Sequence, residues 1–366
     1  MRFFNGILGC LLVAGLAPAE DVNRYAENFT IEAAGTHQLL TIRNPLAGSG
    51  AERSFALVPR DAPLPDLPPG LPLLRVPLER VVALETVPLG YLDALDALDC
   101  LAGVGSAQYI SNQQVRASLG DGSIQAVPSG PGLDAEAVLL LRPGLILVSA
   151  SNDPASGLPG ALLRASPAIL PTTGYLEPHP LGRAEWLKVF AALLGKEAAA
   201  EHIFNETADR YEALAESVRD VAQRPSVFCQ APFAGVWHMP GGKSHTARLI
   251  ADAGGGYLWA NDPGPAGIPL DLERVFLRAS GAGIWLQPGM HRSLESLLQA
   301  DPRFRRFEAV SAGHVFNNTR QANPQGGNPI HEDALVRPDA VLADLIYILH
   351  PARLPQHKLL YYERLP

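Results

Sequence analysis

Polar and aromatic side chains follow most of the expected β-strands of this chain, at the point where each strand ends. Parallel strands present their carboxyl ends at one edge of a sheet, and ligands bind at that edge. Aromatic rings, imidazoles, carboxylates and cations in such segments suit a large polar ligand that carries a ring system. The candidate ligand-binding residues are Glu85, Tyr109, Tyr175, Glu177, Trp237, His238, Lys243, His291, Asn318 and Arg320.

The segment 237–244 contains Gly-Lys-Ser, the end of the phosphate-binding loop motif. That motif requires a Gly five positions before the Gly of Gly-Lys, and position 237 is Trp, so the motif is not present. A Gly-Gly turn that opens a helix at Ser244 remains. We expect its amide groups to be free to contact an anionic group of the ligand.

The motifs of common enzyme classes are missing from the sequence. The 10 His residues include no His-Glu-x-x-His pair, and no Gly-x-Ser-x-Gly or Gly-x-Gly-x-x-Gly follows a strand. The sequence therefore predicts a protein that is not an enzyme.

Two alternatives stay open. One is a direct metal-ion binder that uses Glu177, His238, His245 or His291, and the other is a hydrolase in which Glu85, Glu177 and His238 form an acid–base group.

The elements that position these residues form two similar halves. In 75–180 and again in 224–350, short β-branched runs alternate with helical periodicity, which predicts parallel strands joined by helices. Residues 181–223 are helical throughout, with a helix over 181–194 that is broken at Gly195 and a second helix over 196–221. At the rise of an α-helix, the second helix reaches about 39 Å. The expected fold is α/β, with two Rossmann-like lobes bridged by a single long helix.

Residues 20–74 differ in character from both halves. Two β-rich runs flank Gly35–His37 and predict a hairpin, and 54–58 predicts a third strand. The Pro-rich stretch 63–72 is a stiff extended connector to the first lobe. We therefore expect an N-terminal β extension, and we expect residues 351–366 to be a tail.

Residues 1–19 are typical of a secretory signal. Arg2 precedes an apolar run that ends in Ala17-Pro18-Ala19, and the run is too short to span a membrane. Cys10 has too little apolar sequence before it for a lipid-attachment site, so we expect a periplasmic protein without a lipid anchor. Cys100 and Cys229 remain after cleavage. Each follows an apolar stretch, which predicts buried free thiols.

Length and charge exclude several partners. The 366 residues, 47% of them hydrophobic, suffice for two domain cores. Only 18% of the residues are charged and the net charge is −8. Neither nucleic acid nor an anionic lipid surface is therefore an expected partner. We expect a monomer.

Two segments have the same form in the two halves. In 132–148 a helix capped by Asp134 carries Glu136 in its first turn and leads into a buried strand, and 269–285 repeats this arrangement. Together with the opening strand 80–84, the Gly-rich step 101–105 and the long helix, these segments resemble the periplasmic binding proteins that deliver iron–siderophore complexes, haem or vitamin B12 to ATP-binding-cassette importers. The resemblance covers residues 75–350.

The resemblance implies that a small-molecule metal complex is held in a cleft between the lobes, with little hinge motion, no cofactor and no catalysis. It also implies that Glu136 and Glu273 dock onto arginines of the permease. The alternative is that both are only helix N-terminal carboxylates, worth about 0.3–1 kcal/mol each. A ferric siderophore is anionic and favours Arg320 and Lys243, whereas a corrinoid or haem favours Trp and Tyr faces with a His ligand.

Overall fold

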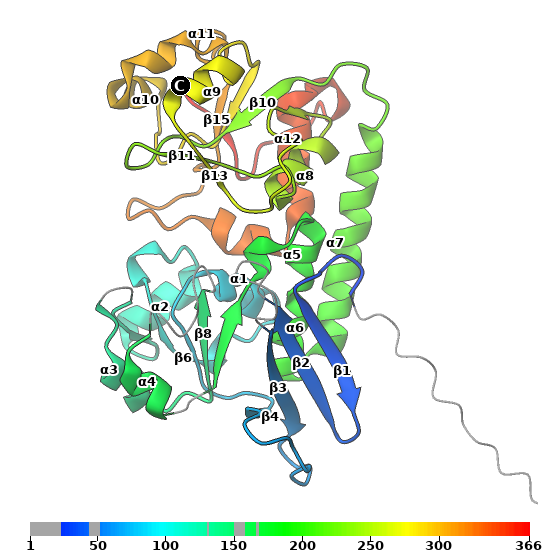
Figure 1. Ribbon diagram of the computed structural model, residues 1–366, viewed down its shortest axis with the longest axis vertical. Coiled ribbons are helices and arrows are strands. Elements are labelled where there is room, and N and C mark those ends of the chain that lie inside the picture. The colour runs from blue at the N-terminus through cyan, green and yellow to red at the C-terminus, as the bar shows by residue number, and fades with distance from the viewer. Residues whose placement is uncertain (1–22, 44–51, 130–131, 150–157, 166–167) are drawn as a thin grey trace, which may run out of the picture.

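The computed structural model shows two α/β lobes, one above the other in Figure 1, with helix α7 (Glu197–Ser217) running alongside both. A four-stranded sheet formed by the N-terminal residues packs beside the first lobe (Figure 1). The structure describes residues 23–43, 52–129, 132–149, 158–165 and 168–366.

The N-lobe is built on a five-stranded parallel sheet. Its strands, in spatial order, are β7 (Gln125–Ala126), β6 (Leu101–Val104), β5 (Val81–Ala83), β8 (Leu145–Ser149) and β9 (Ile169–Thr172). The central strands are continuous apolar runs because helices cover both faces of a parallel sheet. The helices of this lobe are α1 (Val87–Ala94), α2 (Gln113–Asp121), α3 (Ala135–Leu140) and α4 (Gly160–Ala165).

The C-lobe repeats this plan with one antiparallel edge. Its sheet runs β12 (Gly256–Tyr257), β10 (Ser226–Cys229), β14 (Ile284–Leu286), β15 (Val315–Asn317) and β16 (Glu363–Arg364), and only β16 is antiparallel to its neighbour. A separate antiparallel pair joins β11 (Trp237–Met239) to β13 (Ile268–Leu270). The helices are α8 (His245–Asp252), α9 (Leu272–Ala279), α10 (Leu294–Ala300), α11 (Glu308–Ser311) and α12 (Pro338–Leu349).

Residues 351–366 are part of the C-lobe, so their prediction as a tail is wrong. Tyr361 and Tyr362 are fully buried, and β16 extends the sheet. The buried carboxylate of Asp344 holds this segment, because it accepts hydrogen bonds from the backbone N–H groups of residues 360–362 at 2.7–3.1 Å. These N–H donors satisfy a carboxylate that would otherwise be costly to bury.

The lobes are joined by three successive helices, α5 (Pro180–Glu185), α6 (Leu187–Leu194) and α7. The helix expected over 181–194 is interrupted at Trp186, and the long helix ends at Ser217 instead of Val221. It therefore spans about 31 Å. Its Ala200 packs in the N-lobe core and its Tyr211 in the C-lobe core. The predicted fold of two α/β lobes is confirmed, and the long helix contacts the cores of both lobes, although two shorter helices precede it in the connection.

The N-terminal sheet contains the predicted hairpin and third strand, and a fourth strand that the sequence did not indicate. Its order is β1 (Phe29–Ala34), β2 (His37–Arg43), β3 (Glu52–Pro59) and β4 (Leu73–Val76). Because β4 pairs in parallel with β3, the Pro-rich stretch returns the chain to the same sheet. The sheet therefore extends to Val76, slightly beyond the boundary expected at residue 74.

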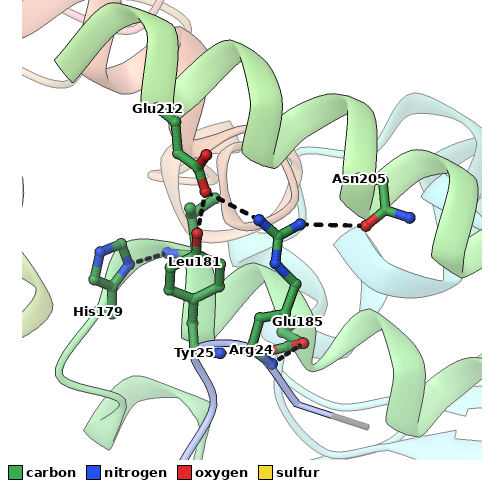
Figure 2. A network of polar contacts seen from close by, with 7 residues as sticks. All are labelled: Arg24, Tyr25, His179, Leu181, Glu185, Asn205 and Glu212. Carbon is green, nitrogen blue, oxygen red and sulfur yellow. Dashed lines mark hydrogen bonds and ion pairs between the residues drawn. The ribbon is translucent and has the colours of Figure 1, made fainter. Parts of the chain in front are cut away.

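Residues 24–28, the N-terminal segment, bind α5, α7 and the turn before α5. Figure 2 shows Arg24 and Tyr25 of this segment with Glu185 and Glu212. The backbone N–H groups of the first three residues donate to Glu185 and those of the last two to Glu177, at 2.8–3.1 Å. The guanidinium of Arg24 also lies 3.1 Å from Glu212 of α7. Both Glu177 and Glu185 are buried, so these hydrogen bonds offset the cost of burying two carboxylates.

Cys100 and Cys229 are both buried and free, as the sequence predicted. Burial raises the pKa of the Cys100 thiol to about 12 and raises the pKa of Cys229 further. In the part of the chain that the structure describes, no helix has the length and apolarity needed to cross a bilayer.

Candidate functional site

The carboxyl ends of strands β5 and β9 in the N-lobe bring a carboxyl group and a phenol together. Glu85 follows β5 and accepts a hydrogen bond from the hydroxyl of Thr172, the last residue of β9. Burial raises the pKa of Glu85 to about 7, and the Arg183 cation opposes this shift. Tyr175 lies in the 3-10 helix η4 (Gly174–Leu176) after β9, and burial beside Glu85 raises its pKa.

Arg183 of α5 supplies a positive charge at this position. Its Nη1 lies 3.1 Å from Nε2 of His245, the first residue of α8 in the C-lobe. A guanidinium can only donate, so Nε2 of His245 accepts and the Nδ1 atom carries the proton. Arg183 Nε and Tyr175 Oη are buried and have no hydrogen-bond partner among the described residues.

Two histidines from the C-terminal half complete the cluster in an uncharged form. Burial and the nearby Arg183 cation lower the pKa of His245 to about 3 and the pKa of His331 to about 4. His331, in η6 (Pro329–His331), keeps contact with solvent and directly follows Ile330, which lines the same pocket as Arg183 and His245. The interlobe site, as we name it, comprises Glu85, Tyr175, Arg183, His245 and His331.

A small pocket lies against the interlobe site. Its volume is about 80 Å³. Cavities that enclose a drug-sized ligand are several times larger, so this pocket can hold only part of such a ligand. Its lining includes the polar residues Arg183, His245, Gln287 and Tyr362 and the apolar residues Leu286, Ile330, Leu335 and Leu345.

Exposed apolar side chains from both lobes meet beside one glycine. The ring of Tyr109 and the Cε of Met290 lie 3.5 Å and 3.9 Å from the position that a Cβ would take at Gly326. Tyr109 is 53% exposed and Met290 is 57% exposed, so both surfaces are available to a ligand. They provide an apolar contact region between the two lobes.

The segment that carries His331 is fixed to the N-lobe. The buried carboxylate of Glu332 accepts hydrogen bonds from the backbone N–H groups of Ser111 and Asn112 and from the Ser111 hydroxyl, at 2.7–2.9 Å. Its backbone carbonyl lies where a Cβ would project from Gly90 of α1, with the carbonyl carbon only 2.5 Å from that position. These contacts restrain the lobes directly, in addition to the connecting helices.

The sequence matches a known protein family over most of the two lobes. The sequence model of periplasmic binding proteins matches residues 81–322, about two thirds of the chain. The chain belongs to the periplasmic binding protein family.

The chain is also similar to curated proteins of known sequence. One uncharacterized lipoprotein of Methanocaldococcus jannaschii is 24% identical over 313 residues, which cover 82% of this chain and 73% of the relative. A second uncharacterized lipoprotein of that organism is 24% identical over 312 residues, with 81% and 76% covered.

Solved structures share the fold at low sequence identity. A periplasmic binding protein from Veillonella parvula has a TM-score of 0.62 at 14% identity and covers 87% of this chain and 99% of its own. A periplasmic heme binding protein from Pseudomonas aeruginosa has a TM-score of 0.56 at 18% identity, covering 77% and 95%. A Helicobacter pylori protein with Ni(II) bound has a TM-score of 0.58 at 15% identity, covering 78% and 88%.

Of the ten predicted ligand-binding residues, Glu85 and Tyr175 lie in the interlobe site, and Tyr109 lies in the apolar contact region. Arg183 and His331 are not among these ten residues. Neither directly follows a strand, since one lies within α5 and the other in a short turn of helix. The only local signal for His331 is the turn-rich stretch 323–332, in which polar and Gly residues precede it.

Trp237 packs in the C-lobe core, so the prediction that it contacts a ligand is wrong. Its indole N–H donates to the carbonyl of Cys229 at 2.8 Å, and its ring lies 5.7 Å from that of Trp285. It is completely buried because these contacts place β11 against the aromatic core. Glu177 was also misplaced: its carboxylate is buried and binds the N-terminal segment and the indole of Trp186.

The remaining five candidates belong to the C-lobe, and none is hydrogen-bonded to the interlobe site in the described residues. His238, Lys243 and Arg320 are exposed, whereas His291 and Asn318 are partly buried. The Gly-Gly turn before Lys243 is not free for an anion either. The Lys243 N–H donates to the carbonyl of Gly264, and that carbonyl stands where a Cβ would project from Gly241.

The fold does not bring together the side chains that the hydrolase or the metal-ion binder would need, within the described residues. Glu85, Glu177 and His238 each have separate surroundings and do not contact one another, so the acid–base group is not assembled. Within the described ranges, no group of three or more His, Cys, Asp or Glu side chains is arranged to hold a metal ion.

Glu136 and Glu273 occupy matching places in the two lobes of this periplasmic binding protein. Each is exposed in the first turn of a helix whose N-cap is an Asp, α3 for Glu136 and α9 for Glu273. Glu273 lies 3.6 Å from the guanidinium of Arg303, yet 74% of its side chain stays exposed. Both carboxylates are therefore accessible to a partner.

Proposed function

We propose that this periplasmic binding protein captures an anionic iron complex of the siderophore type and delivers it to an importer of the ATP-binding-cassette type. The observation that supports the ligand class is Arg183, a partly buried residue whose buried Nε has no protein partner in the described residues, as is also true of the Tyr175 hydroxyl. A cation with unused donors, beside histidines held neutral, suits a ligand that brings negative charge and oxygen acceptors.

A corrinoid or haem is the second ligand class, and the arrangement of aromatic residues favours it less. Trp237 and Trp285, the indoles that could stack on a macrocycle, are buried in the core instead. The relative from Pseudomonas aeruginosa is a heme binding protein, however, and Tyr175, His245 and His331 are groups that ligate iron. A test of the ligand must therefore include both classes.

Titration of the purified protein tests the proposal. Ferric hydroxamate and ferric catecholate complexes, haem, cobalamin and Ni²⁺ are added separately, while tryptophan fluorescence and the melting temperature are followed. We expect a ferric siderophore to change both signals, because Trp186 hydrogen-bonds Glu177 and packs beside Gly174, next to Tyr175. Saturable binding of cobalamin, haem or Ni²⁺ with no response to ferric siderophores would contradict the proposed ligand.

The affinity for an anionic complex should fall as the pH rises through about 7, the pKa of Glu85. Below this pH Glu85 is protonated and uncharged, so it does not offset the attraction of the Arg183 cation for an anionic ligand. Above this pH the negative Glu85 carboxylate repels the ligand and weakens binding. The test uses a ferric siderophore whose own charge is constant from about pH 6 to pH 8, and compares Kd across that range. Glu85→Gln should keep the low-pH affinity at every pH. An unchanged pH dependence in this variant would show that Glu85 is not the titrating group.

We also propose that the protein is exported and that residues 1–19 are removed. Intact mass of the protein isolated from cells measures this, and we expect a chain that begins at Glu20 without added lipid. Two relatives are named lipoproteins, so the informative contrary result is a chain that begins at Cys10 with a lipid mass on the thiol. That mass would replace the cleavable signal by a lipid anchor.

Docking on the importer is proposed to use the exposed Glu136 and Glu273, one on each lobe. Their exposure and equivalent positions support this role, since an exposed carboxylate can pair with an arginine of a partner.

A further inference from the structure

The helices that carry Glu136 and Glu273 share a seven-residue pattern. Residues 134–140 and 271–277 both follow Asp-x-Glu-x-Val-x-Leu. In each helix the Asp side chain caps the first turn by accepting backbone N–H groups, and the Val is completely buried. Asp and Val thus fix how each helix sits on its lobe, and the Glu and the Leu remain on the outside.

The two leucines of this pattern are unusually exposed. Leu277 is 87% exposed and Leu140 is 81% exposed, the two highest values for large apolar side chains among the described residues. A single exposed leucine is ordinary and needs no explanation. Here two exposed leucines occupy the same position of a repeated pattern, each four residues after an exposed Glu. Residues four apart share one helix face, so each Leu lies beside its Glu on the surface.

The two helices are also equivalent in the topology of their lobes. Helix α3 leads into β8, which pairs with β5, the first strand of the N-lobe sheet. Helix α9 leads into β14, which pairs with β10, the first strand of the C-lobe sheet. Figure 1 shows α3 in the lower lobe and α9 in the upper lobe. Each lobe therefore presents a Glu–Leu pair at the same point of its fold.

We infer that each Glu–Leu pair is one half of a bipartite docking surface, which binds a permease that offers two equivalent sites, each a cation beside an apolar pocket. This inference rests on the proposed function and adds the leucines to the docking carboxylates. The exposed carboxylates are complementary to a cation of the partner, and the leucines one turn away are complementary to an apolar pocket. The repeat implies that the two sites on the partner are alike.

The Arg303 contact does not remove Glu273 from this surface. Arg303 is held mainly by Asp301, at 2.7 Å, and approaches Glu273 only to 3.6 Å. Glu136 makes no ion pair with any residue in the described ranges, so a cation of the partner is its natural counterion. A permease arginine can displace Arg303 from Glu273 without breaking the shorter Asp301 pair.

The test replaces both leucines and measures uptake and capture separately. The variant Leu140→Ala/Leu277→Ala replaces the chromosomal copy in the source organism, and uptake of radioactive iron as the ferric siderophore is followed. We expect uptake at limiting protein to fall about 10-fold, which corresponds to about 1.4 kcal/mol of lost docking energy. The Kd of the purified variant for the same ferric siderophore and its melting temperature should not change.

Two control variants make the result specific. Leu64→Ala removes another exposed leucine, 68% exposed and outside the pattern, and should leave uptake unchanged. The variant Leu140→Met/Leu277→Met keeps an apolar side chain and should retain most of the uptake.

The outcomes separate the inference from the proposed function. If Glu136→Arg/Glu273→Arg abolishes uptake and the double alanine variant does not reduce it, the leucines are not part of the docking surface, although the proposed function stands. If the alanine variant loses siderophore affinity as well, the leucines act on the ligand site and the inference is wrong. If the unaltered protein binds no ferric siderophore, the proposed function itself fails.

Discussion

Replacing Arg183 by Gln should weaken the binding of a ferric siderophore by about 10- to 100-fold. A hydrogen bond to a charged group contributes about 1.5–3 kcal/mol, and each step of about 1.4 kcal/mol is a tenfold change in Kd. Arg183 is the cation of the interlobe site, and its Nε has no protein partner in the described residues that a ligand would have to displace. Fluorescence titration of the variant gives the Kd, and its melting temperature shows that it is folded.

Two further variants separate charge from geometry at this position. Arg183→Lys keeps the positive charge but loses the planar fork of N–H donors, so we expect an intermediate Kd. Arg320→Gln removes an exposed arginine of the C-lobe that the sequence singled out for the same role, and it should leave the Kd unchanged. The opposite ranking, with a large loss at Arg320 and none at Arg183, would move the ligand away from the interlobe site.

The fold could be predicted because its signals are local in the sequence. Strands such as β8 are continuous apolar runs, and the helix before β8 begins at a capping Asp, so the parallel α/β plan can be read directly. The long helix α7 has regular apolar spacing. Its last turn could not be placed, since Val218 fits the helical spacing and is buried, yet it takes a non-helical backbone as the C-cap.

The interlobe site could be predicted only in part, because tertiary packing assembles it. Glu85 and Tyr175 follow strands, so the rule for strand ends finds them. Arg183 reaches His245 only because α5 packs against α8 of the other lobe, and nothing in the local sequence indicates that contact. Trp237 was misassigned for the same reason, since the turn after β10 leads into the β11–β13 pair and not to the edge of the sheet.

Gly90→Ala should destabilise the protein, because Gly90 of α1 packs against the backbone of Glu332. A Cβ at position 90 would overlap the Glu332 carbonyl oxygen and would lie 2.5 Å from its carbon, and both are backbone atoms. Overpacking of this kind costs about 1–3 kcal/mol, although alanine is the better helix former by up to about 1 kcal/mol. We expect a net loss in the free energy of unfolding, measured by urea denaturation.

Gly120→Ala is the matched control for this substitution. Gly120 also lies in a helix of the N-lobe, α2, and beyond its neighbours and the backbone of its own helix no atom is within 4 Å of its Cβ position. The same change should therefore stabilise the protein by up to about 1 kcal/mol. Opposite signs for the two glycines would show that the loss at position 90 comes from the Glu332 contact and not from helix propensity.

Gly90→Ala should also reduce ligand affinity, although Gly90 does not belong to the interlobe site. The displaced carbonyl is that of Glu332, which directly follows His331, and the Glu332 carboxylate holds the segment on Ser111 and Asn112. Moving this segment shifts His331 and opens the contact between the lobes. If the variant binds a ferric siderophore as tightly as the parent while it loses stability, then the position of His331 is not required for capture, and the ligand is held by the N-lobe and Arg183 alone.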